Sequence, residues 1–206
     1  MRIFFYLCLV TLNACSTEYS RHTLRGALTD LGLMDEVSYT RQADWVLHSS
    51  SKILLLEPEI NLAGQDQRLN HRTHAAMRDA LMHSFRKHFP SSRSSTHSLA
   101  SVTTHSFVSS DYIVGARLFH VQDNLNTRAE LHEGRGLHKG RHYGRDEIDI
   151  QLQIFDARSR RLLDSIALSA RAAFLVRDDR LPADVIQPSM DKLVAALAGN
   201  EALKQL

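Results

Sequence analysis

The sequence has little of what a cysteine-based or nucleic-acid-binding function would need. Only two of its 206 residues are cysteines, Cys8 and Cys15, and both lie near the N-terminus. The charge is nearly balanced, with 25 Lys and Arg side chains against 23 Asp and Glu side chains and a formal net charge of +2 at pH 7. Because nucleic-acid-binding domains usually carry a concentrated basic patch, and no basic run is long here, this balance argues against a nucleic-acid partner.

The apolar run at the N-terminus is too short to cross a membrane. It occupies residues 3–12 (IFFYLCLVTL), contains no charged residue and follows Arg2. A membrane-spanning helix needs about 20 apolar residues. A basic residue followed by a short apolar run is instead typical of a signal peptide, which is removed from the mature protein.

The end of this run resembles the lipobox of bacterial lipoproteins. Leu12 stands three residues before Cys15, and the small residue Ala14 stands directly before it. An ordinary secretory cleavage site prefers small residues at the first and third positions before the cut, and Leu12 violates that preference. The resemblance implies cleavage before Cys15, which would then carry a diacylglycerol on its thiol and an acyl chain on its amine. A plain secreted protein and an uncleaved N-terminus are the alternatives.

Lipidation of Cys15 would decide both the location and the chemistry of the mature chain. Each buried CH₂ group adds about 0.8 kcal/mol to membrane binding, and more than one acyl chain gives stable anchoring. In the lipoprotein sorting pattern, Asp after the cysteine favours the inner membrane. Ser16 stands there, so the resemblance implies the periplasmic face of the outer membrane. With Cys8 removed and Cys15 acylated, no disulfide, thiolate nucleophile or cysteine metal ligand is left.

The pattern of apolar residues predicts one α/β (α+β) domain. We expect a signal peptide over residues 1–14, a lipidated N-terminus and tether over 15–43, and a periplasmic domain over 44–206. Strict alternation from Glu147 to Phe155 predicts a half-solvated antiparallel strand that forms a hairpin with the following strand. We expect a mixed β-sheet flanked by about three helices. The expected strands are 52–60, a short edge strand within 91–96, 112–121, 147–155 and 162–176; the expected helices are 67–89, 98–109 and 184–198, with a short one possible at 24–34.

A set of strand-like segments runs along the chain: 38–41 (SYTR), 45–47 (WVL), 52–56 (KILLL), 111–114 (DYIV) and the hairpin 148–170. Together they resemble an uncharacterised family of proteobacterial lipoproteins, catalogued as a domain of unknown function. The resemblance covers nearly the whole chain. The element order is also similar to the periplasmic α/β domains of the curli secretion lipoprotein, the export lipoprotein PelC and the amino-terminal part of TolB. Those are assembly or partner-binding modules, so the likeness implies a non-catalytic role.

The long polar segment between the strands 112–121 and 147–155 is the best candidate for a functional site, because loops of this length are often functional. Its residues 132–142 (HEGRGLHKGRH) combine imidazoles with cations. Imidazoles are common zinc and copper ligands, so a metal site is one interpretation. The neighbouring cations disfavour a bound metal and favour contact with a partner or an anionic surface. The imidazoles belong to His132, His138 and His142, and the cations to Arg135, Lys139 and Arg141.

The sequence contains no catalytic signature. The serine-rich segment 91–95 lacks a G-x-S-x-G motif, and the segment 132–142 lacks H-E-x-x-H. Histidines 71, 74 and 88 on the predicted helix are expected to border its apolar face, with a pH-sensing or metal role as the alternative. We therefore expect a non-enzymatic accessory, scaffold or partner-binding lipoprotein without a cofactor, whose partner is an envelope protein or polymer. A periplasmic zinc- or copper-binding lipoprotein is the main alternative, an enzyme acting on glycan or lipid is another, and the oligomeric state stays open.

Overall fold

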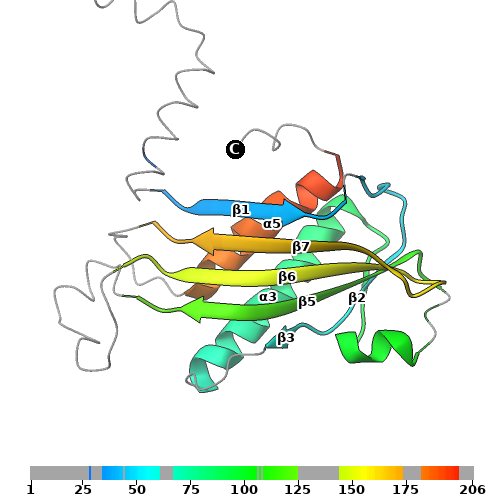
Figure 1. Ribbon diagram of the computed structural model, residues 1–206, viewed down its shortest axis with the longest axis horizontal. Helices are drawn as coiled ribbons and strands as arrows, with labels where there is room; N and C mark the ends of the chain where they lie inside the picture. The colour runs from blue at the N-terminus through cyan, green and yellow to red at the C-terminus, as the bar shows by residue number, and fades with distance from the viewer. Residues whose placement is uncertain are drawn as a thin grey trace, which may run out of the picture.

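A mixed sheet of seven strands, covered on one face by two α-helices, forms the part of the chain that the computed structural model describes (Figure 1). This confirms the expected α/β class, with one α-helix fewer than expected in the described ranges. Those ranges are residue 28 and residues 34–43, 45–60, 67–105, 107, 109–124, 144–173 and 182–199. The strands are β1 (Glu36–Arg41), β2 (Ile53–Leu55), β3 (Glu59–Ile60), β4 (Arg93–Ser94), β5 (Tyr112–Gln122), β6 (Glu147–Asp156) and β7 (Leu162–Arg171), and the helices are α3 (Gln67–His88), η1 (Leu99–Thr103), η3 (Pro182–Val185) and α5 (Ile186–Leu197).

The sheet has an antiparallel part and a parallel part. Its strand order is β1-β7-β6-β5-β2-β4, and β3 also pairs with β5. The strands from β1 to β5 in this order are antiparallel neighbours, whereas β2, β3 and β4 join β5 and each other in parallel. Parallel neighbours need crossover connections, which α3 and the segment containing η1 supply. The hairpin of β6 and β7 confirms the expected antiparallel pair.

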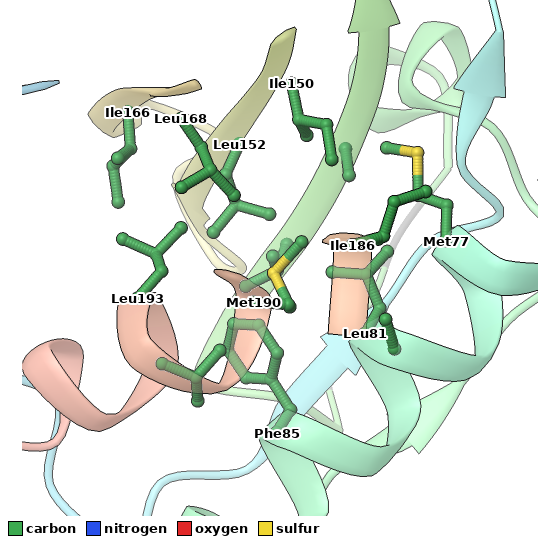
Figure 2. Close-up of a cluster of buried hydrophobic side chains, with 14 of the residues drawn as sticks. Met77, Leu81, Phe85, Ile150, Leu152, Ile166, Leu168, Ile186, Met190 and Leu193 are labelled. Carbon is green, nitrogen blue, oxygen red and sulfur yellow. The ribbon is translucent and has the colours of Figure 1, made fainter. Parts of the chain in front are cut away.

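The alternation of β6 sorts its side chains between the two faces of the sheet as the sequence predicts. Ile148, Ile150, Leu152 and Ile154 are buried under the helices, whereas the intervening side chains point to the opposite face. Figure 2 shows Ile150 and Leu152 of β6, with Ile166 and Leu168 of β7, facing apolar side chains of α3 and α5. The labelled helix residues, all at most 2 % exposed, are Met77, Leu81 and Phe85 of α3 and Ile186, Met190 and Leu193 of α5.

Among the described residues, only η1 covers the opposite face of the sheet, and it does so at one corner. Leu99 and Val102 of η1 pack with Ile113 in a second, smaller apolar cluster. Leu99 lies directly on Gly115, where a Cβ atom would come within 2.1 Å of the Leu99 Cδ2 atom. A side chain at this position of β5 would therefore force Leu99 to move. Towards the other end of β5 no described helix covers this face, and Phe119 is 46 % exposed there.

Two segments differ from expectation. β1 lies within the stretch 15–43 that we expected to be a tether, and it pairs with β7 along its whole length. Val37 and Tyr39 alternate with Ser38 and Thr40 along β1 and pack against the core, so this strand has a period-two pattern that the expectation of a tether overlooked. The helix expected over 98–109 is wrong, because only a 3-10 helix of five residues forms there. This segment is rich in Ser, Thr and Val, which have low helix propensity. None of the helices in the described ranges has the length and apolar character that a bilayer crossing requires.

Candidate partner-binding site at one end of the sheet

The predicted partner loop leaves and re-enters the domain between two neighbouring strands. β5 and β6 stay paired up to Gln122 and Glu147, so residues 125–143 connect the ends of an antiparallel pair. The backbone N–H of Asn124 donates to Asp146 Oδ1 at 2.8 Å, and Asn124 Nδ2 donates to the carbonyl of Arg145 at 2.7 Å. These bonds fix the distance and direction between the two ends of the loop.

Arg145 connects the ends of the loop to the chain that enters β1 and to the chain that leaves β7. Its Nε donates to the carbonyl of Ala172 at 2.6 Å, just after β7. Its Nη1 donates to Glu36 Oε2 at 3.1 Å, and its Nη2 donates to the carbonyl of Met34 at 3.0 Å. We call Glu36, Asn124, Arg145 and Asp146 the anchor cluster. Through it the entry of the chain into β1, the loop ends and the exit from β7 meet at one end of the sheet (Figure 1).

Asp146 is fully buried, which the sequence did not reveal. It directly precedes the half-solvated strand predicted to begin at Glu147, yet its exposed fraction is 0 %. Its Oδ1 accepts the Asn124 N–H, and its carbonyl accepts the N–H of Ala172 at 2.8 Å. A buried carboxylate is tolerated only when hydrogen bonds or charges compensate its lost hydration. Asp146 is therefore part of the structural base of the loop.

The residues that we predicted to be functional lie outside the described residues. They are Cys15, the cations Arg135, Lys139 and Arg141, and the imidazoles His132, His138 and His142. For this site, the structure shows how the two ends of the loop are held. Within the described ranges, no three His, Cys, Asp or Glu side chains are grouped so that they could hold a metal ion.

The histidines of α3 occupy three different environments. His71 is exposed, and His74 Nε2 donates to the carbonyl of Pro58 at 3.1 Å and lies 3.5 Å from Glu57 Oε1. His88 has a buried Nε2 atom without a hydrogen-bond partner. Burial and the nearby Lys87 lower the pKa of His88, while Asp191 of α5 opposes that shift. The expectation of boundary positions therefore fits His74 and His88 best.

Ser84 and His88 of α3 lie near Asp191 of α5, but these three residues do not form a catalytic relay. Ser84 Oγ donates directly to Asp191 Oδ1 at 2.5 Å, and Gln187 Nε2 donates to the same oxygen at 2.9 Å. A relay of the serine-hydrolase type needs an imidazole between the hydroxyl and the carboxylate. Here the hydroxyl and the carboxylate bond to each other, so this cluster joins two helices.

We call the face of the sheet opposite the helices the open sheet face. It carries a shallow hollow over β1, β7 and β6. Its volume is about 240 Å³. The exposed ring of Phe119 borders it, and the Arg117 guanidinium lies 6.0 Å from the centre of that ring. Arg117 is itself held by Glu59, with 2.7 Å between Nη2 and Oε2. The other outward-pointing side chains around the hollow are Ser38, Thr40, Asp149, Gln151, Ala167 and Ser169.

The sequence identified only part of this surface. The alternation of β6 indicated that Asp149 and Gln151 face solvent. The floor of the hollow also needs the small side chains of β1, and that strand lies in the segment expected to be a tether. No local pattern of residues indicates that β1 pairs with β7, because this pairing joins segments far apart in the chain.

The described residues define a two-layer α/β domain with an open sheet face and a loop fixed at one end. The chain belongs to the family described as Domain of unknown function (DUF4823), whose model matches residues 47–197. This confirms the expected relationship to an uncharacterised family. A search among curated proteins finds no match.

Several solved structures align with this chain at low sequence identity. The PelC dodecamer from Paraburkholderia phytofirmans aligns with a TM-score of 0.52 and 8% identity, over 79% of this chain and 98% of that chain. A DUF330 protein from Xanthomonas campestris aligns with a TM-score of 0.46 and 11% identity, over 84% and 94%. A lipoprotein from Neisseria meningitidis aligns with a TM-score of 0.42 and 9% identity, over 74% and 98%. The PelC match supports the two-layer fold.

Proposed function

We propose that this protein is a non-catalytic partner-binding module, held at the periplasmic face of the outer membrane by lipidated Cys15. The anchor cluster carries the proposal. Arg145 bonds both to the residues that enter β1 and to the end of β7, directly at the ends of the cationic loop. The loop that would bind the partner and the chain that would reach the membrane thus start from the same end of the domain.

The chain length between Cys15 and Met34 limits how far this end can be from the membrane. An extended chain covers at most about 3.5 Å per residue, so the anchor cluster would lie within roughly 65 Å of the lipid. A partner reached by the cationic loop would therefore lie in, on or near the same membrane. An envelope protein or polymer with an acidic surface fits this position and the charges of Arg135, Lys139 and Arg141.

The fold and the polar clusters support a binding role rather than catalysis. The buried polar groups of the described residues hold structural elements together: Asp146 supports the loop ends, and Asp191 joins α3 to α5. PelC, whose fold is similar, is described as a dodecamer. We extend to this chain only the idea that such a domain can act by associating with protein surfaces, whether those of copies or of another protein.

In-cell chemical crosslinking of the full chain in its native envelope tests the proposal. The test variant carries Arg135→Gln, Lys139→Gln and Arg141→Gln, and the matched control carries Arg72→Gln, Arg158→Gln and Arg161→Gln at exposed positions elsewhere. We expect the wild-type chain and the control to give the same crosslinked partner and the loop variant to lose it. An identical crosslinking pattern for all three proteins would contradict the proposed role of the loop.

A further inference from the structure

A second hollow lies at the end of the sheet where the parallel strands begin, opposite the anchor cluster. It has a volume of about 350 Å³. Lys52 directly precedes β2, Arg93 opens β4, and Ser109 and Ser110 come just before β5. The eleven residues of β5 separate this hollow from the anchor cluster by about 35 Å. Pro90, Ser91 and Ser92, between α3 and β4, complete its lining.

The hollow carries two positive charges that the described residues do not neutralise. Lys52 and Arg93 are both exposed, and neither forms an ion pair with a carboxylate in the described ranges. Asp111 directly follows the two serines. Its Oδ2 accepts the backbone N–H of Lys52 at 2.8 Å. Asp111 therefore fixes the backbone of Lys52 at the start of β2.

Hydroxyl groups supply neutral donors beside these cations. Ser92 is buried, and its Oγ donates to the carbonyl of Phe89 at 2.7 Å, which fixes the turn between α3 and β4. The hydroxyls of Ser91, Ser109 and Ser110 make no hydrogen bond to another described residue. The residues that carry these three hydroxyls, an ammonium and a guanidinium thus line one concave surface.

We propose that this hollow binds a phosphate group. Arg provides a planar fork that matches two phosphate oxygens, Lys provides a point charge, and serine hydroxyls donate to the remaining oxygens. The volume exceeds that of one water molecule about tenfold, which leaves room for a phosphate and part of the molecule that carries it. Because the hollow lies opposite the anchor cluster, a phosphate ester in solution fits better than a headgroup of the membrane that holds the protein.

Titration calorimetry of the full chain in nonionic detergent tests this proposal, with inorganic phosphate and a soluble short-chain phosphatidylglycerol as separate probes. We expect saturable phosphate binding, weakened about tenfold or more by Lys52→Gln combined with Arg93→Gln. Arg72→Gln, which removes an exposed cation from α3, is the control and should bind like the wild-type chain. Ser109→Ala should weaken binding less and does not alter the charge.

The two probes distinguish the sources of the phosphate. Tighter binding of inorganic phosphate than of the lipid supports a soluble ligand, whereas tighter binding of phosphatidylglycerol supports a phosphate site that takes a lipid headgroup. Binding of neither probe by the wild-type chain would overturn the proposal. So would phosphate binding that the double substitution leaves unchanged while circular dichroism shows a folded protein.

Discussion

The two faces of the sheet differ in how deeply their side chains are buried. The helix-covered face is filled by side chains at most 2 % exposed, including Leu152, Phe85 and Met190. The open sheet face instead carries small polar side chains, a hollow and the exposed ring of Phe119. Because the covered face is closed by packing, the proposed partner would have to bind at the open sheet face, at one of the two ends of the sheet or at the loops.

The largest effect should come from emptying the covered face. Phe85 is 0 % exposed and packs between the helices and the sheet (Figure 2). Phe85→Ala should lower the free energy of unfolding by about 3–5 kcal/mol, because the lost apolar contacts leave a cavity. Phe119→Ala, on the open sheet face, should change it by only about 0.5 kcal/mol. Urea unfolding of both variants measures the difference, and equal losses would contradict the comparison.

The sequence predicted the helix-covered face better than the open sheet face. Regular patterns located the covered face: the predicted alternating strand 147–155 and the predicted helix 67–89 correspond to β6 and α3, whose Ile148 and Met77 are buried. The open sheet face depends on β1 pairing with β7, which no local pattern reveals. The burial of Asp146 was missed for a similar reason, because its partner Asn124 lies on the other side of the loop.

Gly115 lies at the corner of the open sheet face that η1 covers, so a substitution there tests that packing. Gly115→Ala places a Cβ atom against the side chain of Leu99, which must move. We expect a loss of about 1–3 kcal/mol in the free energy of unfolding, as is usual for overpacking. In a chain that already carries Leu99→Ala, adding Gly115→Ala should lower the free energy of unfolding by less than it does in the wild-type chain, because the clashing side chain is gone. A Gly115→Ala protein as stable as the wild-type chain would show that η1 does not pack on β5 as described.

The anchor cluster tests whether the loop end is a structural unit. Arg145→Ala removes the guanidinium that bonds to Ala172, Glu36 and Met34. We expect a loss of about 1–3 kcal/mol, since acceptors in a partly buried site lose their partner. Hydrogen exchange should become faster at Glu36 and Ala172 and stay unchanged at Ile166 in the centre of β7. Uniformly faster exchange would contradict a local role.

The smallest expected effect is a pH dependence from His88 on the covered side. Burial lowers the pKa of His88 below its ordinary value of 6.5, so the unfolded chain binds this proton more readily than the folded chain. Stability should therefore fall as the pH drops below about 6.5 and be recovered as the pH rises. Urea midpoints at about pH 7.5 and about pH 5.5 measure the change.

His88→Gln should reduce this pH dependence, whereas His83→Gln, at an exposed position of the same helix, should leave it as in the wild-type chain. The charged groups that act on His88 are Lys87 of its own helix and Asp191 of α5. A pH dependence that survives the His88 substitution in full would assign it to other groups.

We propose that the domain works while lipidated at Cys15, so that its cationic loop meets a partner near the membrane. Mass spectrometry of the N-terminal peptide, from protein purified out of the bacterial envelope, measures this modification. We expect a mature chain that begins at Cys15 and carries a diacylglycerol and an amide-linked acyl chain, both lost in a Cys15→Ser variant that stays uncleaved. A chain with a free Cys15 thiol, or one cleaved at another residue, would contradict it.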